Sequence, residues 1–143
     1  MNLLPDIQVT QVSNGSAAGQ TEVDSSILDM SGYDGVMFVA SLAAVTDACV
    51  LTLTPQDNAT NATGGMAAIT GITAPTFTAS TSSNTMLVVD VYRPQLRYVR
   101  AALTRTAQNA AVNCIVAIQY KATKKPTTQG ATVLASAYGP ASS

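Results

Sequence analysis

The sequence contains no histidine and no tryptophan, and only 10% of its residues are charged. Histidine is the usual general base and the commonest metal ligand. Its absence therefore excludes Ser-His-Asp and Cys-His catalytic sites and most zinc or iron sites. The sequence also lacks the P-loop, GxGxxG, GxSxG and CxxC signatures. We therefore expect a protein that is not an enzyme, with no catalytic residues, no cofactor and no bound metal.

Charged residues make up about 25% of a typical globular protein, so this surface must be covered mainly by threonine, serine, asparagine, glutamine and alanine. A surface so poor in charge suits burial against other protein, and the alternative is a soluble β-protein with a threonine-rich exterior. The beginning of the sequence shows no basic region followed by an apolar core, and the longest apolar stretch is far shorter than a membrane helix. We expect synthesis in a cytoplasm and no membrane partner.

Two cysteines, Cys49 and Cys114, fall within predicted strands. Without a secretion signal, both are interpreted as small buried apolar residues rather than as a disulfide or a redox pair.

The two parts of the chain carry opposite charge. Residues 1–60 hold seven acidic side chains and no basic one, whereas residues 61–143 hold seven basic side chains and only Asp90 as an acid. If the two parts interleave in the fold, their charges pair within one molecule. If they lie at opposite ends, the acidic face of one copy complements the basic face of another. The net charge of −1 argues against direct nucleic-acid binding.

Apolar and polar residues alternate along most of the chain, which predicts strands and no convincing helix. Seven to nine strands are expected, at residues 6–12, 20–30, 36–43, 49–54, 66–72, 76–81, 86–92, 96–103 and 112–120. Residues 36–43 and 49–54 are expected to pair as a hairpin, with Cys49, Leu51 and Leu53 facing inward. Many short strands separated by glycine and proline turns favour an all-β fold, a single-domain antiparallel sandwich or jelly roll over residues 1–122. Residues 123–143 are predicted to form an extended or flexible C-terminal arm, with Val133, Leu134 and Tyr138 as apolar anchors.

A cluster of basic residues is the best candidate for a partner interface. Arginine presents a planar fork of donors that suits carboxylates on a partner. The alternative is that these arginines pair with the acidic part of the same chain. The candidate interface residues are Arg93, Arg97, Arg100, Arg105, Lys124 and Lys125.

Three blocks of sequence resemble a known family. They are Met30-Ser-Gly-Tyr-Asp-Gly-Val-Met-Phe, then Leu87-Val-Val-Asp-Val-Tyr-Arg-Pro running into Arg97-Tyr-Val-Arg-Ala, and Lys124-Lys-Pro-Thr-Thr-Gln. Together they resemble the capsid cement, or decoration, proteins of tailed bacteriophages, which have a jelly-roll fold.

The resemblance implies a virion protein on the capsid exterior, made in the host cytoplasm. Its partners would be the major capsid protein and further copies of itself, as a dimer or trimer. It would stabilise the shell by holding neighbouring capsid proteins together, and it carries over no catalytic residues. Two other functions stay open at this point, a tail or head–tail connector protein and a carbohydrate- or receptor-binding β-sandwich.

Overall fold

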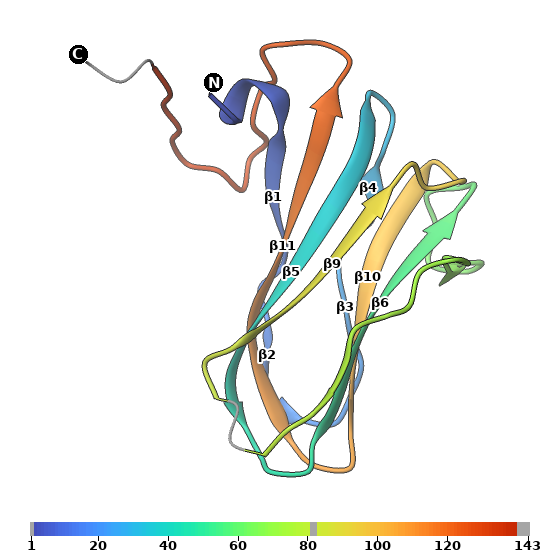
Figure 1. The fold of residues 1–143 in the computed structure, drawn as a ribbon, viewed down its shortest axis with the longest axis vertical. Coiled ribbons are helices and arrows are strands. Elements are labelled where there is room, and N and C mark those ends of the chain that lie inside the picture. Colours follow the sequence, from blue (N-terminus) through green and yellow to red (C-terminus); the bar gives the residue numbers. More distant parts are fainter. Residues whose placement is uncertain (1, 81–82, 140–143) are drawn as a thin grey trace.

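The chain folds into two antiparallel β-sheets packed face to face (Figure 1), and the computed structural model describes residues 2–80 and 83–139. The strands are β1 (Gln8–Ser13), β2 (Ser16–Gly19), β3 (Val23–Asp24), β4 (Leu28–Asp29), β5 (Tyr33–Val45), β6 (Val50–Asn58), β7 (Ala67–Ala68), β8 (Thr76–Thr78), β9 (Met86–Tyr92), β10 (Tyr98–Thr106) and β11 (Ala110–Ala122). A short 3-10 turn, η1 (Leu4–Asp6), precedes them. The predicted all-β antiparallel sandwich is confirmed.

Each sheet has long central strands and an edge made of short ones. Sheet A has the order β1-β11-β5-β9, and β2 continues the β1 edge along β11. Sheet B has the order β3-β10-β6-β7, with β4 beside β10 and β8 beside β6. Between β2 and β3 the chain crosses from sheet A to sheet B, so residues 8–29 contribute to one edge of both sheets. The segment predicted as one strand over residues 20–30 holds two short strands instead, β3 and β4, which both pair with β10 and are separated by residues 25–27.

The core lies between the two sheets and takes alternate residues from the long strands. Phe38 and Ala40 from β5, Leu51 and Leu53 from β6, and Ile115 from β11 are fully buried there. The predicted inward face of Cys49, Leu51 and Leu53 is confirmed, because all three are buried. Cys49 and Cys114 are both free, but Cys114 is only half-buried, so the expectation of burial holds for Cys49 alone.

The predicted hairpin of residues 36–43 and 49–54 is wrong. These residues belong to β5 and β6, which lie in different sheets: β5 pairs with β9 and β11, whereas β6 pairs with β7, β8 and β10. Both strands carry a full row of apolar side chains. They bury more apolar surface by facing each other across the core than by pairing edge to edge. The turn at Thr46 and Asp47 therefore connects the two sheets.

Strand β6 also continues past Pro55, although the sequence pattern predicts its end at residue 54. Pro55 lies opposite Ala101 of β10, but Ala101 exchanges its hydrogen bonds with Ser25 on the other side of β10. The pair of Pro55 and Ala101 therefore needs no N–H from proline, which explains why a proline is tolerated at a central position.

The C-terminal segment runs back along β1. Thr127 and Gln129 bond to the backbone of Pro5, Ile7 and Val9, and the carboxylate of Asp6 pairs with Lys125 at 3.2 Å. The predicted division of the chain into a sandwich domain and an arm at residue 122 stays a prediction. Residue 81 of a predicted strand and residues 140–143 of the predicted arm lie outside the described residues. In the part of the chain that the structure describes, no helix is long and apolar enough to cross a membrane.

Candidate functional site

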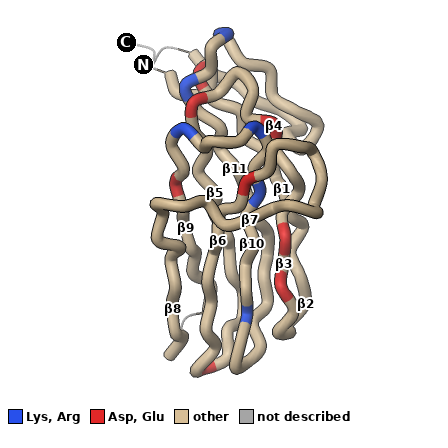
Figure 2. Tube along the Cα trace, turned by 90° about the vertical axis from the view of Figure 1, so that its right-hand side faces the viewer, with Lys and Arg blue, Asp and Glu red and all other residues tan. Residues whose placement is uncertain are grey.

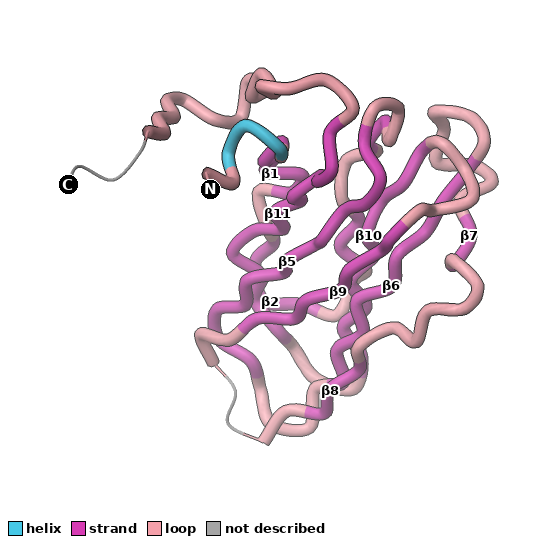
Figure 3. The backbone as a smooth tube through the Cα atoms, turned by 45° about the horizontal axis from the view of Figure 1, so that its top comes forward, coloured by secondary structure: helices cyan, strands magenta, loops and turns pink. Residues whose placement is uncertain are grey.

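The outer face of sheet A, the face turned away from the core, is apolar. Strands β5, β9 and β11 lie side by side and their cross-strand register aligns the outward residues (Figure 3). Val116, Val39 and Val88 form one row, and Ile118, Met37 and Asp90 form the next, so this largely apolar face includes one carboxylate. The six residues that we call the apolar face are Met37, Val39, Met86, Val88, Val116 and Ile118. Met86 is 64% exposed and Val88 is 46% exposed.

The outer face of sheet B is polar by contrast. Its outward residues on β6 and β10 include Thr52, Thr54, Gln56 and Thr104, and the hydroxyl groups of Thr52 and Thr76 are hydrogen-bonded at 3.1 Å. An antiparallel sheet with one face in water shows this alternation of apolar and polar residues, whereas strands covered on both faces are apolar throughout. Strands β5, β9 and β11 therefore have the sequence of a sheet covered on both faces, although this chain covers only one.

The apolar face ends in a groove beside η1. Its volume is about 400 Å³, and Leu3, Ile7, Met37, Ile118 and Tyr120 supply its apolar lining. The ring of Tyr120 lies directly over Gly35, where a Cβ atom would be 2.3 Å from the tyrosine Cζ. Burial and the hydrogen bond to the Asp90 carboxylate raise the pKa of Tyr120 far above its ordinary value, so the phenol stays protonated. Asp6, Lys121 and Lys125 supply the remaining charges of this groove.

The structure separates the four predicted interface arginines. Arg93 follows β9 in an exposed loop, with its guanidinium 5.1 Å from the centre of the Tyr92 ring. Arg97 is exposed and makes two hydrogen bonds of 2.8 Å to the carboxylate of Asp29. Arg100 projects from the outer face of sheet B, where it bonds to Gln56 and lies 3.5 Å from Asp24. These residues do not form a single cluster.

Arg105 lies inside the molecule and is only 1% exposed. Strand β10 extends to Thr106, so Arg105 has the inward orientation of Val99, Ala101 and Leu103. Its guanidinium donates to the carbonyl oxygens of Ala17, Thr21 and Ala110 at 2.9, 2.7 and 2.6 Å, and to two hydroxyl groups. A side chain bound in this way is not available to a partner, so we leave Arg105 out of the candidate interface.

The remaining candidates lie at the end of the molecule where both termini are found. Lys124 is exposed, and Lys125 pairs with Asp6. In the described residues three ion pairs are formed, Asp29–Arg97, Asp24–Arg100 and Asp6–Lys125. Each joins the acidic part of the sequence to the basic part, so at these positions the two parts interleave. Most charged residues lie toward this end of the sandwich, while the opposite end carries few (Figure 2).

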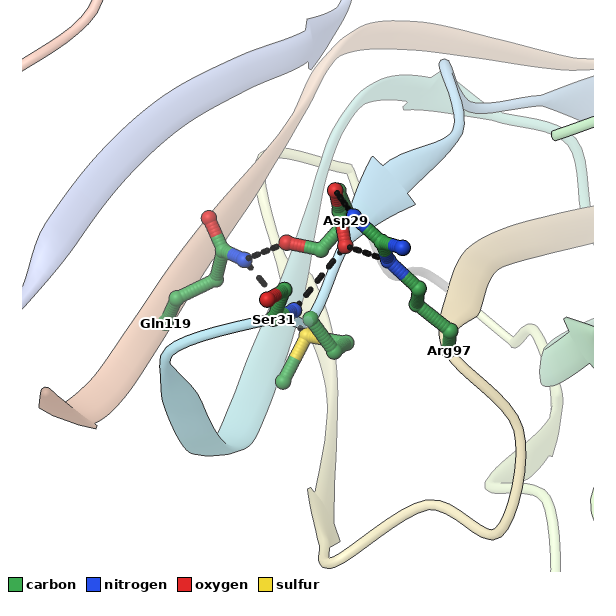
Figure 4. A network of polar contacts seen from close by, with 5 residues as sticks. Asp29, Ser31, Arg97 and Gln119 are labelled. Carbon is green, nitrogen blue, oxygen red and sulfur yellow. Dashed lines mark hydrogen bonds and ion pairs between the residues drawn. The ribbon is translucent and has the colours of Figure 1, made fainter. Parts of the chain in front are cut away.

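One polar network joins the two sheets at this end (Figure 4). The Asp29 carboxylate accepts from Arg97 and from the backbone N–H of Ser31, and the Asp29 carbonyl accepts from the buried Gln119 of β11 at 3.0 Å. The network fixes the turn between β4 and β5 through Ser31. It also ties this turn to Arg97, at the end of the loop between β9 and β10.

We expect acid to weaken the Asp29–Arg97 contact. The hydrogen bonds from Arg97 hold the pKa of Asp29 below its ordinary value, because they favour the carboxylate. The contact therefore stabilises the folded protein fully at pH values above the pKa of Asp29 in the unfolded chain, which is near 4. This stabilisation is lost as the pH falls through the lower pKa that Asp29 has in the folded protein. The effect is small because both side chains are about half exposed.

Thermal unfolding of Asp29→Asn and wild-type protein between pH 2 and pH 6, at low salt, measures this contribution. The difference between the two midpoints should shrink as the pH falls, and high salt should reduce it throughout. A difference that stays constant over the acid range would contradict the assignment.

The fold is similar to solved structures of a viral capsid protein. The subviral particle of infectious bursal disease virus VP2 matches with a TM-score of 0.56 and 7% identity, over 84% of this chain and 34% of that one. Structures of the Gx and Gt strains of this virus match with TM-scores of 0.51 and 0.50, at 10% and 9% identity, each over 85% of this chain and 34% of theirs. The chain thus spans about a third of their length. No protein-family model and no curated protein sequence matches.

These similarities show a β-sandwich of the kind found in that capsid protein, and at such low identity they show the fold alone. The apolar face was not identified from the sequence as a binding surface. A signal for it was present, because residues 36–45 and 86–92 are apolar on both alternating sides except at Ser41 and Asp90. In the described residues no group of three cysteine or acidic side chains is placed to hold a metal ion.

Proposed function

We propose that this chain is a structural protein of a virus particle, which binds the outer surface of a capsid shell and holds neighbouring major capsid proteins together. The observation that carries the proposal is the apolar face, which has the composition of a covered surface but lies bare on the isolated chain. Burying it against another protein would remove the still exposed parts of Met86 and Val88 from water, each contributing about half to two-thirds of the roughly 1.5–3 kcal/mol of a full burial. The similarity of fold to a viral capsid protein and the resemblance to bacteriophage cement proteins support the same conclusion.

The proposed mechanism is purely mechanical. A protein that contacts two neighbouring capsid subunits at once binds only the assembled shell, and therefore stabilises that state by mass action. The apolar face would supply the buried area. The exposed cations Arg93 and Lys124 would lie at the rim of this contact and set its orientation more than its strength. We propose no catalytic role, in keeping with the absence of histidine from the sequence.

Carbohydrate binding is less well supported. Sugar sites commonly use the open face of an aromatic ring, and Tyr92 is the most suitable exposed ring near the apolar face. Two cations, Arg93 and Lys121, each lie 5.1 Å from the centre of that ring, and Tyr120 is stacked parallel to it at 6.5 Å. These neighbours compete with a sugar for the ring.

A charge placed at the centre of the apolar face should weaken binding to the shell. Val88→Glu is the preferred change because Val88 is already 46% exposed, so glutamate there is tolerated in the free protein but would be desolvated in the complex. We expect shell affinity to fall at least about tenfold, which corresponds to about 1.4 kcal/mol. The measurement is co-sedimentation with capsid shells that lack the protein, followed by cryo-electron microscopy of the mixture.

Thr104→Glu on the polar face of sheet B is the matched control and should bind like the wild type. If the wild-type protein adds no density to the shells, the cement function is wrong. Rings or tubes formed by the protein alone would then favour a tail or connector role.

A further inference from the structure

The C-terminal arm carries apolar side chains that make little contact with their own chain. Residues 131–139 contain no charged side chain, and Leu134 is 100% exposed while Tyr138 is 55% exposed. A single exposed leucine is common on protein surfaces. Two large apolar residues on a projecting segment with no charge of its own are a different case, because together they expose more apolar area to water than a single side chain does.

The base of the arm is fixed, so the arm leaves the sandwich from a defined point. The side chains of Gln129 and Thr132 accept hydrogen bonds from the backbone N–H groups of Val9 and Gln11, at 2.8 and 3.1 Å. These bonds occupy donors along the free edge of β1, which would otherwise be open to pairing with another strand. Beyond Thr132 the segment turns away from both sheets (Figures 1 and 3). The seven residues from Thr132 to Tyr138 can span about 20 Å when extended.

The groove at the end of the apolar face has complementary properties. Leu3, Ile7, Met37 and Ile118 give it an apolar lining. Its volume of about 400 Å³ lies near the lower end of the range of about 300–1,000 Å³ that is usual for ligand-binding pockets. In an extended segment, residues 134, 136 and 138 point to the same side, which places Leu134 and Tyr138 on one face. A tyrosine in such a groove can bury its ring and direct its hydroxyl group toward the charges at the rim, among them Asp6 and Lys121.

We propose that the arm of one copy docks into the groove of a second copy, with Leu134 and Tyr138 as its anchors. A second copy is the occupant because the arm turns away from the sandwich that carries it, while its exposed apolar residues match the groove in character. A reciprocal exchange closes a two-fold dimer, and a one-way exchange around an axis closes a ring such as a trimer. This assembly does not depend on the capsid partner proposed above.

Disulfide trapping between two singly substituted proteins tests the exchange directly. Both carry Cys114→Ala, one has Leu134→Cys on the arm, and the other has Leu3→Cys beside the groove. Under mild oxidation we expect a cross-linked dimer joining one protein of each kind, seen by non-reducing electrophoresis. Thr104→Cys, on the outer face of sheet B, replaces Leu3→Cys in the control and should give no more than background.

A protein with both cysteines on one chain distinguishes exchange from docking within the same chain. A cross-link that closes only within single chains, or no cross-link above the control, would overturn the proposal.

The concentration dependence of self-association gives a second readout. Leu134→Asp should weaken self-association by about 10- to 100-fold, the effect of losing a buried leucine, as measured by analytical ultracentrifugation. At concentrations low enough for the wild type to be monomeric, the unfolding midpoint should not change, because Leu134 is fully exposed in the single chain. Ala135→Asp adds the same charge on the opposite side of the extended arm and should have a smaller effect. Equal effects of the two changes, or none from Leu134→Asp, would contradict the proposal, whereas loss of shell binding alone would not.

Discussion

Replacement of Arg105 by methionine is expected to lower the free energy of unfolding by roughly 3–5 kcal/mol. The guanidinium donates to three carbonyl oxygens, those of Ala17, Thr21 and Ala110. Methionine fills a similar volume but leaves these acceptors without their donor. When a buried ion pair is replaced by apolar residues, both charged partners can be removed together. Here three of the partners are backbone carbonyl groups, which no substitution removes.

The position of Arg105 explains why the loss should be felt by the whole fold. Ala17 lies in β2 of sheet A, Thr21 lies where the chain crosses to sheet B, and Ala110 begins β11. The side chain thus joins both sheets at the end of the molecule opposite the groove. The domain is expected to have a total stability of about 5–15 kcal/mol, so this one substitution would remove a large fraction of it.

Urea denaturation at constant pH measures the change as a shift in midpoint with an unchanged slope. Arg97→Met is the matched control, since Arg97 is exposed and its contact with Asp29 contributes little, so the midpoint should shift far less than for Arg105→Met. Arg105→Lys should recover only part of the loss, because an ammonium group cannot reproduce the planar fork. Equal stability of Arg105→Met and the wild type would contradict the prediction. It would mean that the free-energy cost of burying the guanidinium cancels the stabilisation from its hydrogen bonds.

Replacement of Gly15 by alanine is expected to lower the free energy of unfolding by roughly 2–4 kcal/mol. Gly15 connects β1 to β2 with φ of +91°, a left-handed conformation that costs an alanine free energy by itself. An alanine Cβ would also be 2.2 Å from the carbonyl oxygen of Val112 and 2.4 Å from that of Asn113. These atoms belong to the backbone of β11, which cannot move away without breaking its pairing with β2 or β5.

Gly71→Ala separates the two causes. Gly71 has a similar φ of +86°, but no atom lies within 4 Å of the point that an alanine Cβ would occupy, so only the conformational cost of roughly 1–2 kcal/mol applies. Thermal and urea unfolding of the two variants should therefore place Gly15→Ala clearly below Gly71→Ala. Equal stability of the two would mean that β11 relaxes around the new methyl group and that the close approach carries no cost.

The local pattern of the sequence predicted individual strands well where the alternation of apolar residues was regular. The strand expected at residues 86–92 has the same bounds as β9, and the inward face of Leu51 and Leu53 is correct. Arg105 shows how much depends on a boundary. The predicted strand ended at Leu103, but the alternation of Val99, Ala101 and Leu103 already pointed to an inward residue at 105. Arg105 was instead predicted to belong to the partner interface.

The sequence by itself determined the fold class and the absence of histidine-based chemistry, because alternation with a period of two and amino-acid composition are local properties of the chain. Tertiary structure decided which strands share a sheet. It also brought three acidic residues of the first part of the chain against three basic residues of the second, and it enclosed Arg105. It also decided that the second apolar side of β5, β9 and β11 stays uncovered. Pairing between distant strands depends on how much surface the whole chain can bury at once, and no short segment carries that information.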